Sequence, residues 1–276
     1  MERVFKRKIY DTLLAWKKND NGSTALLIEG ARRVGKSTIV EEFAKREYAS
    51  YLMIDFAFAS EDVKALFNDI SNLDLLFTRL QLEYNVSLVK GDSLIIFDEI
   101  QKCPKARQAI KMLVKDGRYH YIETGSLLGI RMKKKRPKSG EEKTLIPSEE
   151  QRIHMYPMDY EEFLWALGNT STMPLLRDVY KNLTPLGDSV NRKLMRDFRL
   201  YMLVGGMPQA VNTYLDTQDL SRVDQIKRNI INLYLEDFLE LDPSGRTSML
   251  FKAIPAQLSS NANRYMVGRV IEGGRI

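Results

Sequence analysis

The sequence predicts an α/β fold: a mostly parallel, five-stranded sheet with helices on both faces, followed by an all-helical region. Five short apolar segments before residue 157 have the character of buried strands, and segments of helical periodicity separate them. After residue 168 no strand pattern occurs. Strands that alternate with helices need crossover connections, and such connections produce a parallel sheet that is covered on both faces.

Each element of the first half has a local signal. Phe5, Ile9, Leu13 and Trp16 recur at the spacing of one helix face, so an amphipathic helix within residues 1–18 is expected to open the chain. The predicted strands are short apolar runs that end at glycine, charged or turn residues: 24–29, 51–56, 93–97, 119–123 and 152–156. Helices are expected where apolar residues recur every three or four positions or where acidic residues or proline favour a helix start: 37–46, from 61, 73–84, from 104 and 160–167.

The second half is predicted to be helical throughout. Leu194, Phe198 and Tyr201 share one helix face, and apolar residues between Val223 and Leu241 continue the same period. The composition changes between about residues 168 and 190. We therefore expect one domain over residues 1–168 and a second region over residues 169–276.

The composition is that of a water-soluble globular protein. Hydrophobic residues make up 44% and charged residues 28% of the 276 positions, which excludes disordered, collagen-like and membrane-embedded chains. No apolar stretch approaches the ~20 residues of a membrane-spanning helix, and the first 20 residues are too charged for a signal peptide. We expect a cytoplasmic protein without a membrane partner. Structural roles are expected for Cys103, His120 and His154, because one cysteine and two histidines cannot form a disulfide framework or a metal site of those residue types.

The net charge of +6 is concentrated in one segment. Between Arg131 and Lys143 the chain has seven basic and two acidic residues, a local charge of +5 that leaves +1 for the remainder. Polarity, two prolines and a glycine predict that residues 131–150 form a long exposed loop. Charged runs of this kind usually serve solubility, and the alternative is a site for nucleic acid or another anionic partner.

The strongest chemical signal is the segment GARRVGKS at residues 30–37, a complete G-x-x-x-x-G-K-[ST] phosphate-binding loop between a predicted strand and a predicted helix. Chance would produce this pattern in about 1 chain in 100 of this length. Its glycines let backbone N–H groups turn toward phosphates, Lys36 neutralises the outer phosphates, and the Ser37 hydroxyl binds magnesium. The side chains of Arg32 and Arg33 are expected to face solvent. The residues expected to bind the nucleotide are Gly30, Arg33, Val34, Gly35, Lys36, Ser37 and Thr38.

An acidic pair, Asp98-Glu99, follows the third predicted strand. At this position Asp98 would support magnesium with Ser37, and Glu99 would act as the general base for the attacking water. An additional strand lies between the loop and the acidic pair, which is consistent with P-loop ATPases that have an inserted strand and a catalytic glutamate. The absence of an Asn-Lys-x-Asp motif, which reads guanine, favours ATP over GTP.

A third signal is Thr124-Gly125-Ser126 at the end of the fourth predicted strand. A hydroxyl at this place can sense the terminal phosphate and orient water, while an ordinary turn with capping hydroxyls explains the segment equally well. Thr124 is therefore a candidate catalytic residue beside Glu99, and Ser126 carries less weight. Asp55, which ends the second strand, is interpreted as a turn residue.

Several segments resemble AAA-type prokaryotic ATPases in which a P-loop domain precedes a C-terminal domain of unknown function. Besides the loop, these segments are IIFDEIQ, ETGS, YPMDYEEFLWALG, YMLVGGMPQAV and IPAQLSSNANRY, so the resemblance covers nearly the whole chain. It implies an ATP-binding domain over residues 1–168, with the N-terminal helix included, and the start of the C-terminal domain within 169–276. It also implies that Lys36, Ser37, Asp98 and Glu99 serve ATP and magnesium and that Thr124 is a sensor.

The resemblance leaves the identity of an arginine finger open. Family members often have a Gly-Arg pair before the fifth strand, where this chain has Glu150-Gln151-Arg152. Members also tend to continue well beyond this chain's end, so we expect this chain to be truncated. A homo-oligomer is the assembly we consider for it.

The expected function is that of an AAA-type ATPase that hydrolyses ATP with magnesium. One alternative is a P-loop kinase that passes the phosphoryl group to a small acceptor. The other is a nucleotide-dependent binding or regulatory module that acts on nucleic acid or a partner protein without appreciable turnover.

Overall fold

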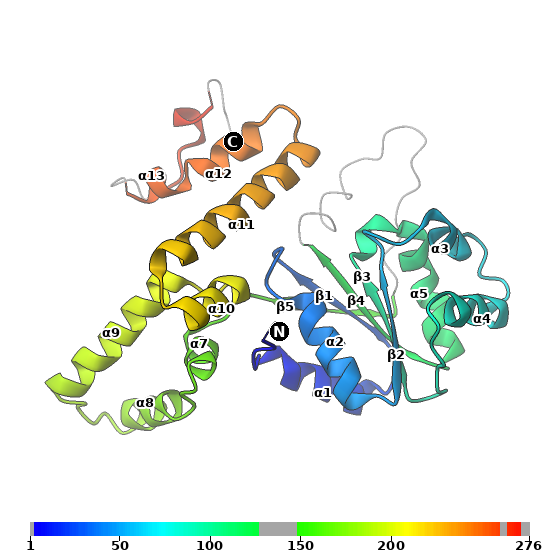
Figure 1. Ribbon diagram of the computed structural model, residues 1–276, viewed down its shortest axis with the longest axis horizontal. Coiled ribbons are helices and arrows are strands. Elements are labelled where there is room, and N and C mark those ends of the chain that lie inside the picture. The colour runs from blue at the N-terminus through cyan, green and yellow to red at the C-terminus, as the bar shows by residue number, and fades with distance from the viewer. Residues whose placement is uncertain (1–2, 127–147, 260–263, 272–276) are drawn as a thin grey trace. The chain divides into compact units, whose positions relative to one another are not determined.

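The computed structural model describes residues 3–126, 148–259 and 264–271 (Figure 1). Five strands form one sheet in the order β2-β3-β4-β1-β5, and every neighbouring pair is parallel. The strands are β1 (Ala25–Gly30), β2 (Ser50–Asp55), β3 (Ser93–Asp98), β4 (His120–Ser126) and β5 (Glu150–Met155). The predicted fold class is confirmed.

Helices connect the strands and cover both faces of the sheet (Figure 1). In the first half they are α1 (Ile9–Asp20), α2 (Lys36–Glu47), α3 (Glu61–Ala65), α4 (Leu73–Glu83) and α5 (Pro104–Asp116). Two short 3₁₀ helices, η1 (Leu66–Asn68) and η2 (Ile100–Lys102), complete the connections. The apolar spacing begins at Phe5, but residues 3–7 are non-helical. Helix α1 therefore begins four residues later, at Ile9.

Alternation along the strands divides the apolar side chains between two cores. Leu26 and Ile28 of β1 belong to the core under α1 and α2, which includes Leu13 and Phe43. Ala25 and Leu27 of the same strand belong to the opposite core, under α3, α4 and α5. Because a strand turns successive side chains to opposite faces, each buried strand supplies both cores.

The histidine and cysteine candidates for structural roles lie within or beside this scaffold. The His120 ring is buried between Trp16 and Tyr48, and its Nδ1 lies 2.9 Å from the Tyr48 hydroxyl. Burial lowers the pKa of His120, and it raises the pKa of the buried Cys103 thiol. His154 is partly exposed and lies 3.8 Å from the Glu29 carboxylate.

Helices alone make up the regular structure described after residue 159. They are α7 (Tyr160–Ala166), α8 (Thr172–Lys181), α9 (Asp188–Val204), α10 (Pro208–Thr217), α11 (Leu220–Leu241), α12 (Arg246–Lys252), α13 (Ile254–Leu258) and the 3₁₀ helix η3 (Val267–Arg269). The chain forms two compact units, residues 1–220 and 221–276, so α7 to α10 belong to the same unit as the sheet. Within the described parts of the chain, no helix combines the length and apolar character needed to cross a membrane.

A buried cluster of charged groups lies on the sheet face that α5 covers. The Arg107 guanidinium binds both carboxylate oxygens of Glu150, with Nη2 at 2.9 Å from Oε2 and 3.0 Å from Oε1. The Glu123 carboxyl group is fully buried, 4.0 Å from Arg107 Nε, and neither of its oxygens has a hydrogen-bond partner among the described residues. Burial, reinforced by the nearby Glu150 carboxylate, raises the pKa of Glu123 well above its ordinary value.

This raised pKa predicts a pH dependence of stability. A carboxyl group whose pKa is higher in the folded state favours folding most below its ordinary pKa of 4.5, and this contribution is lost as the pH rises through the folded-state pKa. Glu123→Gln removes that titration, so the variant should gain stability relative to the parent as the pH rises, by at most about 1.4 kcal/mol per pH unit. Urea denaturation across about pH 5 to 8 measures the difference.

Glu83→Gln, which removes an exposed carboxyl group, is the matched control. A difference between parent and Glu123→Gln that stays constant across the pH range would show that Glu123 is not the buried, proton-binding group described here.

Candidate functional site

The predicted phosphate-binding loop joins the end of β1 to the start of α2. Arg33 and Gly35 have positive φ angles of 68° and 90°, so two residues of the loop have the left-handed conformation before the helix begins at Lys36. The Arg33 side chain is exposed, whereas Val34 is fully buried. The loop therefore delivers the chain directly to the N-terminus of a 12-residue helix, where backbone N–H groups and the helix dipole favour an anion.

Both glycines of the loop motif meet a steric requirement. A Cβ at Gly30 would lie 2.4 Å from the Met155 carbonyl oxygen, because β5 passes directly beside this position. Gly35 has a left-handed backbone conformation, which residues other than glycine rarely adopt. The path of the loop consequently depends on glycine at both ends.

Lys36 is almost completely buried at the start of α2, with 5% of its surface exposed. Its Nζ donates hydrogen bonds to the carbonyl oxygens of Gly30 at 3.2 Å and Ala31 at 3.1 Å. Burial lowers the pKa of Lys36, and the nearby carboxylates of Glu99 and Asp98 partly oppose this effect. The ammonium group is thus held inside the curve of the loop, close to both members of the acidic pair.

The Asp98 carboxylate joins three segments that are distant in the sequence. Asp98 is the last residue of β3 and is buried, with 4% of its surface exposed. Its Oδ1 accepts a hydrogen bond of 2.8 Å from the Ser37 hydroxyl in the first turn of α2. The same oxygen accepts a hydrogen bond from the buried Thr124 hydroxyl of β4. Loop, acidic pair and Thr124 therefore meet at the carboxyl ends of β1, β3 and β4.

Glu99 follows immediately in an unusual backbone conformation. Its φ angle is 52°, in the left-handed region that is uncommon for residues other than glycine and recurs at functional sites. Its N–H donates a 3.4 Å hydrogen bond to Thr124 Oγ1, and its carboxylate accepts a hydrogen bond from Gln101 in η2. This turn directs the chain away from the strand so that Asp98 and Glu99 have different surroundings.

Other sequence candidates lie at the margin of this cluster. Ser126 pairs with Gly30 at the end of β4, and Thr38 is partly buried in the first turn of α2. The Asp55 carboxylate accepts a hydrogen bond of 2.8 Å from the Ala57 N–H, which is turn geometry, and Asp55 pairs with Asp98 in the sheet. Burial raises the pKa of Asp55, and the charge of Asp98 adds to this effect.

One candidate for charge recognition, Arg152, does not join the cluster. Arg152 lies on β5, where its Nε donates a 2.7 Å hydrogen bond to Glu150, within the charged cluster under α5. The basic segment Arg131–Lys143 lies outside the described residues.

Sequence reasoning missed two residues that contact the site. Gln101 contacts Glu99 and lies only two positions beyond it in the DEIQ segment, so proximity in the sequence was a usable signal. Arg7 donates a hydrogen bond of 2.8 Å from Nη1 to the Val34 carbonyl oxygen of the loop. No local pattern reveals that contact, because it joins residues 27 positions apart.

The search of curated proteins found no match. Among solved structures, C. elegans PCH-2 is similar with a TM-score of 0.43 and 13% identity over 84% of this chain and 70% of that chain. A STAND signal transduction ATPase with a tetratricopeptide repeat sensor from Pyrococcus horikoshii has a TM-score of 0.38 and 16% identity over 82% of this chain and 33% of that chain.

Two family models match the sequence itself. A domain of unknown function (DUF8612) matches residues 195–272, and the model described as AAA domain matches residues 22–164. The match to the AAA domain model begins just before β1, contains all five strands of the sheet and ends within α7. Because it spans more than half of the 276 residues, the protein belongs to the AAA domain family.

Proposed function

We propose that this protein binds ATP together with magnesium and hydrolyses its terminal phosphate. The observation that carries the proposal is the Asp98 carboxylate, which accepts hydrogen bonds from both Ser37 of the phosphate-binding loop and Thr124 of β4. Membership of the AAA domain family supports nucleotide binding in the same part of the chain. Hydrolysis and the residues that perform it are our inference from this geometry.

The loop offers the charge and hydrogen bonds that a nucleotide phosphate requires. Among the described residues, the buried Lys36 ammonium has two backbone carbonyls as hydrogen-bond partners and no carboxylate within ion-pair distance. A bound phosphate would give this buried cation an anionic partner, and that interaction would offset the cost of burying the charge. We assign nucleotide contacts to Gly30, Arg33, Val34, Gly35, Lys36, Ser37 and Thr38.

Ser37 and Asp98 fit magnesium by the chemistry of their donor atoms. Magnesium prefers oxygen ligands and usually retains several waters, taking one or two protein groups together with phosphate oxygens. In the described parts of the chain, no group of three or more His, Cys, Asp or Glu side chains could hold a metal ion alone. The Ser37 hydroxyl and the Asp98 carboxylate are therefore proposed to hold magnesium with the bound phosphates, where the ion neutralises charge during phosphoryl transfer.

Glu99 and Thr124 are proposed to act on the attacking water. The Glu99 carboxylate lies beyond the strand end, near Lys36, and is held by Gln101. From this place it can accept a proton from water as a general base. The Thr124 hydroxyl lies between Asp98 and the Glu99 N–H, so it can orient the water or detect the terminal phosphate.

The first prediction of this proposal concerns nucleotide binding. Lys36→Ala removes the buried ammonium group, so magnesium-ATP should raise the melting temperature of the parent and leave that of the variant unchanged. At 100 times Kd a ligand stabilises the native state by about 2.7 kcal/mol, which thermal denaturation with and without ATP detects. Lys45→Ala, on the exposed side of α2, is the matched control and should respond like the parent. Equal shifts in the parent and Lys36→Ala would refute the assignment.

The second prediction concerns hydrolysis. Glu99→Gln keeps the shape of the side chain but cannot accept a proton, so ATP binding should persist while turnover falls by roughly 100- to 10,000-fold. Phosphate release with magnesium and no acceptor measures this loss, with Glu61→Gln, which alters an exposed carboxylate, as the control.

Three other outcomes would contradict the hydrolysis proposal. Turnover that survives Glu99→Gln would remove Glu99 from the role of base. Turnover that strictly requires an acceptor would indicate a kinase, and ATP binding without turnover in the parent would indicate a nucleotide-dependent binding module.

A further inference from the structure

Arg7 is a buried arginine that contacts three separate parts of the chain. Only 5% of its surface is exposed. Its Nη1 donates a hydrogen bond of 2.8 Å to the Val34 carbonyl, and its Nη2 donates one of 2.6 Å to the Tyr156 carbonyl just after β5. Its Nε lies 3.2 Å from Glu162 Oε1 in α7. The guanidinium group therefore links the phosphate-binding loop to the start of the helical region.

The contact with Val34 lies at the most constrained part of the loop. Val34 is fully buried between Arg33 and Gly35, the two residues with positive φ angles. In a loop that turns its N–H groups toward phosphates, carbonyl groups on the outer side need other partners, because a buried carbonyl without a hydrogen bond is costly. Arg7 supplies that partner with a charged donor, which gives a stronger hydrogen bond than a neutral group.

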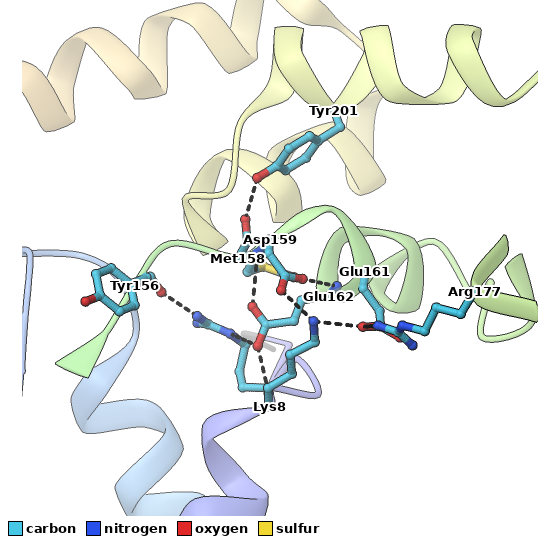
Figure 2. A network of polar contacts seen from close by, with 9 residues as sticks. Lys8, Tyr156, Met158, Asp159, Glu161, Glu162, Arg177 and Tyr201 are labelled. Atoms are coloured by element: carbon cyan, nitrogen blue, oxygen red, sulfur yellow. Dashed lines mark hydrogen bonds and ion pairs between the residues drawn. The ribbon is translucent and has the colours of Figure 1, made fainter. Parts of the chain in front are cut away.

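The contact with Glu162 places Arg7 at the N-terminus of α7. Figure 2 shows Asp159 and Glu162 close together there, where they form a capping box. Glu162 Oε2 accepts a 3.1 Å hydrogen bond from the Asp159 N–H, and Glu162 Oε1 accepts one of 2.7 Å from the Lys8 N–H. A single carboxylate thus caps the helix and binds both Arg7 and the backbone that follows Arg7.

The network continues into α8 through charged side chains. Lys8 Nζ lies 2.6 Å from Asp159 and 2.7 Å from Glu161, and Glu161 also binds Arg177 of α8 (Figure 2). The Arg177 hydrogen bond and the Lys8 contact hold the pKa of Glu161 down at about 2, against the effect of burial. Glu161 is consequently ionised at any physiological pH, so the link to α8 does not depend on pH.

The same segment is bound to α9 and to the residues between α9 and α10. The Met158 N–H donates a 2.7 Å hydrogen bond to the Gly206 carbonyl, and the Tyr201 hydroxyl donates one of 2.9 Å to the Met158 carbonyl (Figure 2). Pro208, the first residue of α10, lies 3.6 Å from the position that a Cβ on Gly35 would occupy. The first residue of α10 therefore lies beside the phosphate-binding loop, while Met158 is held by α9 and by the residues that precede α10.

We propose that Arg7 is a positioning residue for the nucleotide: it holds the loop in its phosphate-binding shape and couples that shape to the segment from Tyr156 to Glu162. This inference rests on the proposed ATP binding. A bound nucleotide that tightens the loop also tightens α7, and a change in α7 alters the affinity for nucleotide by the same factor. Arginine suits the position because its donors lie on separate nitrogens: Nη1 and Nη2 reach the Val34 and Tyr156 carbonyls while Nε faces Glu162, whereas lysine has a single nitrogen.

The test compares Arg7→Lys with Arg177→Lys. Arg7→Lys keeps the positive charge beside Glu162 but cannot serve all three contacts, whereas Arg177→Lys alters the same network at a distance from the loop. Equilibrium titration with magnesium-ATP should show affinity about 10- to 100-fold weaker for Arg7→Lys, the effect of losing a charged hydrogen bond. Arg177→Lys should bind like the parent.

Hydrogen exchange provides a readout that a merely stabilising role would not change. In the parent, magnesium-ATP should slow amide exchange both in residues 34–38 and in residues 159–166. In Arg7→Lys at saturating ATP, the slowing should persist in the loop and disappear from α7. Glu162→Gln, which keeps the cap because glutamine also serves in a capping box, should show the same uncoupling. It provides the test if Arg7→Lys does not fold.

The possible failures are distinguishable. If the parent does not bind ATP, both the proposed function and this inference are wrong. If the parent binds ATP and Arg7→Lys matches it in affinity and in the protection of α7, only the role of Arg7 is refuted. The same applies if Glu162→Gln retains full protection of α7.

Discussion

The shared Asp98 carboxylate is the interaction on which the proposed chemistry depends. It joins Ser37, which follows β1, to Thr124 in β4, and it is itself the end of β3. These three strands are neighbours in the sheet order β3-β4-β1, and all run in the same direction, so their carboxyl ends share one edge. A parallel sheet therefore brings together groups that are 61 and 26 residues apart in the sequence. Hydrogen bonds to a buried carboxylate then fix the geometry, because each partner would otherwise lose water without compensation.

Strand alternation explains why adjacent residues of β4 have different environments. Thr124 pairs with Ile28, whose side chain lies in the core under α1 and α2, and the Thr124 hydroxyl reaches Asp98 on that side. Glu123 pairs with Leu27, which belongs to the opposite core, and lies beside Arg107 of α5. One face of the sheet thus carries the candidate site, and the other buries a cluster of charges that has no contact with the loop among the hydrogen bonds and ion pairs of the described residues.

Much of the scaffold follows from local sequence, while the connections around the site do not. The G-x-x-x-x-G-K-S pattern, the apolar run before Asp98 and the fourth strand suffice to predict that Ser37, Asp98 and Thr124 meet at one edge. Local patterns cannot predict that one oxygen of Asp98 binds both hydroxyls, because this depends on strand register. The contacts of Arg7 could not be predicted for a related reason. Its partners Val34 and Tyr156 lie 27 and 149 positions away, and helical periodicity describes only neighbours within one element. Likewise, the charge pattern of residues 131–143 does not by itself decide between a role in solubility and an anionic partner, and those residues lie outside the described structure.

The central claim is that Ser37 and Asp98 bind magnesium together with ATP, and the magnesium dependence of ATP affinity tests it most directly. Isothermal titration of parent and Ser37→Ala with ATP, at increasing magnesium concentration and with the metal chelated, measures this dependence. The parent should bind ATP more tightly as magnesium increases, whereas Ser37→Ala should retain weak ATP binding and lose most of the magnesium-linked gain. The same gain in both proteins, or no binding of ATP by the parent, would contradict the account.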